Sequence, residues 1–140
     1  EEQVVEMEAK LREPNRNDFI RIYRAALQNI DPIAKFMFLY SLLLEIVTKY
    51  TDDKSQSKVD DFIKKCPEYK KEEDQFSTKE PRKKGSRKKE TVYTWLRNQV
   101  GHTSSSKSNI TSVRITIESK VNELSQIVKR AIEQEINNKI

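Results

Sequence analysis

Residues 33–47 read IAKFMFLYSLLLEIV, a run in which only Lys35 and Glu45 carry a charge. Asp31 and Pro32 stand directly before it, and this pair is typical of a helix N-cap followed by a first-turn proline. We therefore expect a helix from about residue 32 to about residue 50. Because its apolar residues occur on nearly every side, such a helix must be buried on nearly every side. In a chain of 140 residues, one of its faces is then expected to meet another domain or a second copy.

Helical periodicity continues on both sides of this run. Two amphipathic patterns cover residues 1–12 and about 15–30, and a short helix ends at Pro67. Apolar residues then recur in steps of three or four from Ile110 to Ile136, which predicts one long C-terminal helix. With two glycines and four prolines, the chain lacks the turn residues that an all-β fold needs. We predict one all-α domain over residues 1–140, a bundle of about five to six helices.

Composition limits the class of protein further. Cys66 is the single cysteine, which excludes an internal disulfide and a cysteine-based zinc site and favours a reducing, cytoplasmic compartment. We interpret Cys66 as a small, partly buried residue and expect no cofactor, no metal and no membrane span. The chain starts with Glu1 in an apparent helical pattern, so we expect a domain of a longer protein or a chain from which a tag was removed.

The positive charge of the chain is concentrated in one segment. Residues 79–90 hold seven basic and two acidic residues, and this excess of five equals the net charge of the whole chain, +5. Residues 68–89 have few apolar anchors and are expected to form a long, flexible loop. Such a run is either a solvated loop or an arm that attracts a polyanion. The candidate RNA-binding residues are Arg82, Lys83, Lys84, Arg87, Lys88 and Lys89.

The next amphipathic pattern covers residues 90–100, and the only histidine of the chain follows it at position 102. Arg97, Asn98 and Gly101 precede His102 within six residues. Positions five apart on a helix are rotated by about 140°, so Arg97 and His102 would diverge on an unbroken helix. Glycine readily ends a helix, and we therefore expect a break at Gly101 that lets both side chains reach one phosphate.

These residues carry a resemblance to a known superfamily. The run RNQVGH at 97–102 resembles the Arg-Asn-x-x-x-His signature of HEPN domains, which are all-α and include many metal-independent endoribonucleases. Together with LYSLLLEI at 39–46, it is most similar to Apea-like and MauJ-like bacterial HEPN proteins, often linked to phage or stress defence. Ser104 stands where HEPN toxins paired with a nucleotidyltransferase commonly have a modified tyrosine, which weakens a toxin–antitoxin interpretation.

The resemblance implies an activity and a role for each residue. His102 would move the protons of RNA cleavage through the ribose 2′-hydroxyl, and Arg97 would stabilise charge on the phosphate. Asn98 would orient His102 or contact the phosphate. Glu45 would either face the site as a partner of Arg97 or emerge at an edge of its helix. HEPN proteins typically form homodimers with one composite cleft. RNA, a second copy and further domains of a longer chain are the expected partners.

Two less specific interpretations stay open. A HEPN module without activity could bind RNA or dock proteins, and a purely structural dimerisation bundle would leave the hexapeptide without a role. A lone histidine after a helix is also often a capping or packing residue. Tyr40, Tyr93 and Trp95 could stack on bases, although core packing is the more frequent role of such aromatic residues.

Overall fold

The computed structural model describes residues 14–77, 88–102 and 109–137. Within these ranges the α-helices are α2 (Pro14–Leu27), α3 (Pro32–Val47), α4 (Gln56–Ile63), α5 (Val92–His102) and α6 (Asn109–Asn137). A short 3-10 helix, η1 (Lys71–Glu73), precedes a two-stranded antiparallel ribbon of β1 (Gln75–Phe76) and β2 (Lys89–Glu90). The all-α bundle predicted from the sequence is confirmed. The helix predicted over residues 1–12 lies outside the described residues.

Helix α3 begins as its sequence predicts. The Asp31 side chain accepts a hydrogen bond of 3.2 Å from the Ile33 N–H, and Pro32 occupies the first helical position. At the other end the Thr48 hydroxyl donates to the Leu44 carbonyl at 2.6 Å. The cap and the proline fix the start of the helix, because they supply the acceptor and the backbone angle that a first turn needs.

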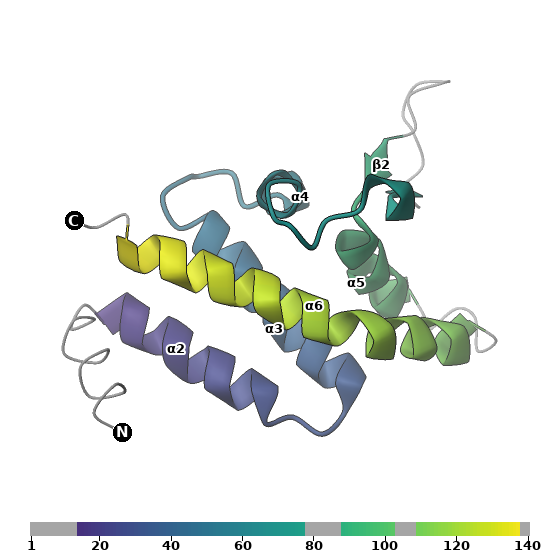
Figure 1. The fold of residues 1–140 in the computed structure, drawn as a ribbon, viewed down its shortest axis with the longest axis horizontal. Helices are drawn as coiled ribbons and strands as arrows, with labels where there is room; N and C mark the ends of the chain where they lie inside the picture. Colours follow the sequence, from purple (N-terminus) through teal and green to yellow (C-terminus); the bar gives the residue numbers. More distant parts are fainter. Residues whose placement is uncertain (1–13, 78–87, 103–108, 138–140) are drawn as a thin grey trace.

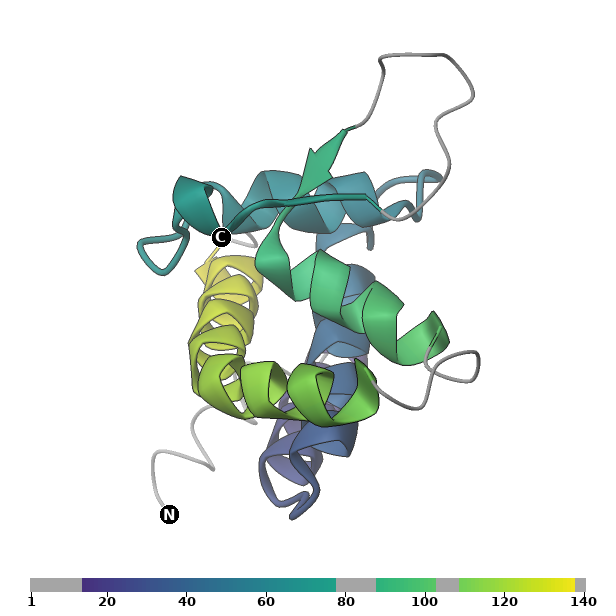
Figure 2. The same ribbon diagram turned by 90° about the vertical axis from the view of Figure 1, so that its right-hand side faces the viewer.

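The long helices α2, α3 and α6 lie side by side, and α6 crosses α3 along much of its length (Figure 1). Helix α4 packs on α3, and α5 lies beside α4 and packs on α6 and α3. Figure 2 shows β2 leading directly into α5. The core between these elements is built from buried aliphatic and aromatic side chains, among them Phe36, Leu39, Tyr40, Leu43, Val59, Ile63, Leu96, Ile117, Leu124 and Ile127.

One face of α3 remains open in the described chain, and the expected contact of one α3 face with another domain or a second copy stays a prediction. The Phe38 side chain is 53% exposed, and Ser41 and Glu45 are also exposed. These residues line a groove of about 300 Å³ together with Phe19 and Ile22 of α2. The reason is geometric. Helices α2, α4, α5 and α6 pack on the rest of α3, and the strip of α3 beside α2 stays in contact with solvent.

The loop predicted over residues 68–89 is partly regular. Its described part contains η1, β1 and β2, and side chains tie it to the bundle. The Lys120 ammonium contacts Glu73 Oε2 at 2.5 Å, and the Tyr69 hydroxyl donates to Asp74 Oδ2 at 2.6 Å. Of the six candidate RNA-binding residues, Arg82, Lys83, Lys84 and Arg87 lie outside the described residues. No helix in the described ranges is long and apolar enough to cross a membrane.

We predict that α3 tolerates truncation on its open face and not on its buried face. Leu43→Ala should lower the free energy of unfolding by about 2–5 kcal/mol, because it removes a fully buried side chain and leaves a cavity. Phe38→Ala, the control on the same helix, should change it by only about 0.5 kcal/mol. Urea unfolding measures both. An equal loss in the two variants would show that Phe38 is covered in solution.

Candidate functional site

Helix α5 is anchored at its start by a buried hydrogen-bond network. The hydroxyls of Thr91 and Thr94 both donate to Asp60 Oδ1 of α4, at 2.6 and 2.7 Å. The Thr94 hydroxyl also lies 2.8 Å from the Tyr40 hydroxyl of α3, and the Thr94 N–H donates to the Thr91 hydroxyl at 3.4 Å. The last contact is an N-cap interaction, since Thr91 directly precedes the helix. Three helices thus meet at one polar cluster.

Burial changes the acidity of this cluster. It raises the pKa of the Asp60 carboxyl, although the hydrogen bonds from Thr91 and Thr94 lower that pKa in part. Burial also raises the pKa of the Tyr40 phenol, and the positive charge of Arg97 is among the smaller influences that lower it. The guanidinium of Arg97 is therefore close enough to act electrostatically on the centre of the α3–α5 interface.

Asn98 is held by a residue that the sequence analysis did not single out. Its side chain is 6% exposed, and it exchanges two hydrogen bonds with Gln56 of α4. Gln56 Nε2 donates to Asn98 Oδ1 at 2.9 Å, and Asn98 Nδ2 donates to Gln56 Oε1 at 3.1 Å. The amide oxygen of Asn98 is thus used within the fold. Its expected contact with His102 or a phosphate stays a prediction, and the geometry assigns it a positioning role on α5.

The helix break that we expected at Gly101 is wrong. Helix α5 runs through Gly101 and ends at His102. A Cβ placed on Gly101 would lie 3.4 Å from Arg97 Nη1, so the guanidinium extends along the helix surface over the glycine one turn later. A helical glycine costs only about 1 kcal/mol relative to alanine, which packing of α5 can offset.

The continuous helix has a consequence for the two signature residues. Backbone positions 97 and 102 are rotated by about 140° around the α5 axis. Arg97 itself is half-buried, and no salt bridge joins it to a carboxylate within the described residues. The His102 side chain is outside what the structure describes.

The structure does not bring Glu45 to Arg97. Glu45 is exposed and lines the groove between α2 and α3. Tyr40 of the same helix faces α5 through Thr94, and Glu45 follows it by five positions, which turns it by about 140°. The two residues thus occupy different sides of α3.

The three candidates for base stacking, Tyr40, Tyr93 and Trp95, lie in different environments. Tyr40 and Tyr93 are each 1% exposed, so both rings are core residues and do not offer a surface for a base. The Tyr93 hydroxyl donates to Glu123 Oε1 of α6 at 2.6 Å, which further fixes α5. Trp95 is half-buried and packs against the core. Lys88 and Lys89 are exposed beside and on β2.

Two positioning residues, Gln56 and Asp60, were missed by the sequence analysis. They stand four positions apart on α4, on the side of the helix that meets α5. The available indication was weak: both are polar residues in a short helix whose buried positions include Val59 and Ile63. Their partners lie 31 to 42 positions later in the chain.

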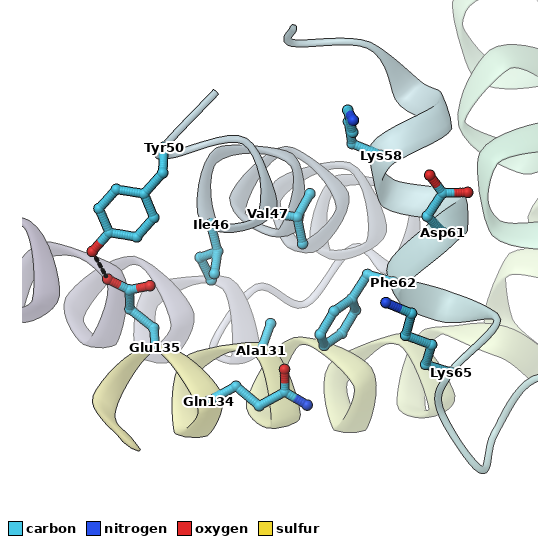
Figure 3. Close-up of a pocket in the computed structure, with 10 residues that line it drawn as sticks. All are labelled: Ile46, Val47, Tyr50, Lys58, Asp61, Phe62, Lys65, Ala131, Gln134 and Glu135. Atoms are coloured by element: carbon cyan, nitrogen blue, oxygen red, sulfur yellow. Dashed lines mark hydrogen bonds between the residues drawn. The ribbon is translucent and has the colours of Figure 1, made fainter. Parts of the chain in front are cut away.

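A hollow of about 270 Å³ lies elsewhere, between the end of α3, α4 and the second half of α6 (Figure 3). On its rim the Tyr50 hydroxyl donates to Glu135 Oε1 at 2.9 Å. No residue of α5 lines it. Within the described ranges, no group of three histidine, cysteine, aspartate or glutamate side chains is placed to hold a metal ion.

This geometry defines a class of protein: an all-α bundle in which α5 carries an arginine and is anchored by buried hydrogen bonds. The chain matches the model of a family described as methylamine utilization protein MauJ over residues 19–133, and it belongs to this family. The MauJ-like resemblance inferred from the sequence is therefore confirmed. The match includes all of α3, α4, α5 and the ribbon. No curated protein and no solved structure matches the chain significantly.

We predict that Gln56 and Asn98 are energetically coupled. Each single change to Ala should lower the free energy of unfolding by about 1–3 kcal/mol, because it leaves a buried (Asn98) or partly buried (Gln56) amide without its partner. The double variant should lose less than the sum of the two, with a coupling of about 0.5–3 kcal/mol. Urea unfolding measures the cycle, and Gln126→Ala on the exposed side of α6 is the control. Additive losses would contradict the pairing.

A second prediction concerns the glycine. Gly101→Ala should stabilise the chain by roughly 0.5–1 kcal/mol, because alanine favours a helix and the new Cβ meets only the mobile end of Arg97. Thermal unfolding with circular dichroism measures the change. A left-handed Gly101, as the expected break requires, would instead make the same substitution destabilising.

Proposed function

We propose that the chain is a HEPN-type endoribonuclease domain that cleaves RNA through the 2′-hydroxyl, at a cleft shared by two copies, in defence or RNA processing. The observation that carries the proposal is that Arg97, partly accessible and without a salt bridge among the described residues, shares one continuous helix with the only histidine of the chain. A guanidinium without a carboxylate partner retains its donors for a phosphate.

The unbroken helix supports a shared cleft over a site within one chain. Backbone positions 97 and 102 are rotated by about 140° around α5, which favours a site that takes its arginine and its histidine from two copies. The reaction also needs a base and an acid, and each copy carries one histidine. Two copies related by a two-fold axis would supply two imidazoles and two guanidiniums.

Exposed apolar side chains support a second copy at this end of the bundle. Helix α5 and the start of α6 lie at the same end as the connection between α2 and α3 (Figure 1). Ile30 in that connection is 96% exposed, and Ile115 near the start of α6 is 63% exposed. The contact between Arg114 and Asp31, at 3.7 Å, holds the two segments together. Such residues favour association when they gather on one surface.

The chemistry follows from these groups. One imidazole removes the proton of the 2′-hydroxyl, whose oxygen attacks the adjacent phosphorus while the bond to the 5′-oxygen breaks. The other imidazole gives a proton to that leaving oxygen. Arg97 stabilises the charge on the non-bridging oxygens. The products are a 2′,3′-cyclic phosphate and a 5′-hydroxyl, and DNA, which lacks the 2′-hydroxyl, is not cut.

A second function is favoured by one specific observation. The oxygen of Asn98 is engaged by Gln56, which leaves the signature without a free asparagine to orient a histidine. This arrangement supports a module that binds RNA through Arg97 and the basic segment and does not cleave it. The basic residues before α5 would serve either function.

Cleavage and the shared cleft are tested together. Purified protein with a chelator should cut RNA and leave 2′,3′-cyclic phosphate ends, and Arg97→Ala and His102→Ala should each abolish this. Lys129→Ala on the exposed side of α6 is the control. In an equal, exchanged mixture of wild type and His102→Ala, a shared cleft predicts about a quarter of the wild-type rate, since only a quarter of the dimers keep both histidines.

Other results would reject parts of the proposal. About half of the wild-type rate in the mixture would mean that each copy carries its own complete site. Cleavage that persists in His102→Ala, or RNA binding without cleavage, would support the non-catalytic module.

A further inference from the structure

The open side of α3 has an apolar centre and one charge toward each end. Phe38, whose side chain is 53% exposed, stands between Lys35 and Glu45. Lys35 precedes Phe38 by three positions and Glu45 follows it by seven, so the three residues project from one side of the helix. Together with the exposed Ser41 they form what we call the α3 strip.

The two charges of the α3 strip are not balanced within the described residues. No salt bridge joins Lys35 or Glu45 to any side chain there. Lys49, the cation that follows Glu45 by one helical turn, is instead paired with Glu135 of α6 at 2.8 Å. The strip thus presents one unpaired ammonium and one unpaired carboxylate.

A hollow beside the α3 strip can receive an apolar side chain. Phe38 lines the groove of about 300 Å³ together with Ile22 of α2, whose side chain is 44% exposed. On the α2 side of this groove, Asp18 is paired with Arg21 at 2.9 Å and adds no net charge. Exposed apolar side chains next to a hollow favour association, because a side chain of one molecule can fill the hollow of another.

We infer that the α3 strip binds the same strip of a second copy in the antiparallel direction, with Lys35 of each copy against Glu45 of the other. The two residues lie ten positions apart, about 15 Å along α3. A second α3 turned end to end about their midpoint places each charge opposite its counterpart. It also places each Phe38 opposite Leu42, which lines the groove of the other copy. A two-fold contact requires a self-complementary surface of this kind.

This contact is separate from the cleft proposed for RNA cleavage. Tyr40 faces α5 through Thr94, and Phe38 is turned by about 160° from Tyr40 around α3. The α3 strip therefore faces away from the helix that carries Arg97. A chain that forms both contacts assembles beyond a dimer, because each contact occupies a different surface.

Charge reversal tests the contact by sedimentation of the full chain over a range of concentrations. Lys35→Glu and Glu45→Lys should each weaken self-association roughly tenfold or more, because two like-charge pairs then face each other across the two-fold axis. An equal mixture of the two variants should regain association, since the mixed pair has opposite charges at both places. Lys129→Glu makes the same change on the exposed side of α6 and should associate as the wild type does.

The mixture distinguishes this contact from any other use of the α3 strip. Single variants that associate as the wild type does, or a mixture that associates no better than its components, would overturn the inference. A chain that sediments as single copies throughout would also overturn it and would leave the strip to a different partner.

Two further readouts separate this contact from folding and from cleavage. Phe38→Ala should also weaken association, and its small effect on unfolding then applies to the dilute, dissociated chain. Lys35→Glu should still cut RNA. A wild type that associates through the α3 strip and cuts no RNA would reject the proposed function and support the α3 contact.

Discussion

The hydrogen bonds from Thr91 and Thr94 to the buried Asp60 carboxylate fix the start of α5, the helix that carries Arg97. Apolar contacts alone allow a helix to rotate or slide at modest cost, whereas buried polar groups must meet partners at defined distances and angles. Tyr40 extends the network to α3. The direction of α5, and with it the ribbon that leads into α5, therefore depends on a small polar cluster.

A continuous α5 holds the backbone of the signature residues on one helix, and the ribbon leads into the start of that helix. Gly101 does not interrupt it, and the Arg97 guanidinium lies along the helix over Gly101. The contacts that hold α5 then orient both the signature residues and the ribbon. A cleft shared by two copies would benefit from this stiffness, because reacting groups must be held within a fraction of an ångström.

The sequence predicts the helices well and the contacts between them poorly. Asp31 and Pro32 mark the start of α3, and the regular apolar spacing after Ile110 marks α6, because caps and periodicity are local properties. Gln56 and Asp60 escape such patterns, since the burial of a polar side chain depends on a partner far along the chain. The ribbon, with two residues in each strand, is too short to give a period.

The prediction of a helix break at Gly101 was wrong for a different reason. A glycine near the end of a helical pattern is compatible with a helix stop and with one more helical turn, and the choice between them depends on tertiary packing. Here α5 packs on α3, α4 and α6 and continues through Gly101. The requirement that Arg97 and His102 of one copy converge was a chemical argument for the stop, and a second copy removes that requirement.

The asparagine of the signature then takes on a structural meaning. Asn98 is adjacent to Arg97, and its two hydrogen bonds with Gln56 set the rotation of α5 about its own axis. Rotation of the helix would move the guanidinium sideways over the surface, so the amide pair determines where the positive charge of Arg97 stands. In this interpretation the Arg-Asn pair works as a unit, in which the arginine meets the phosphate and the asparagine holds the arginine in register.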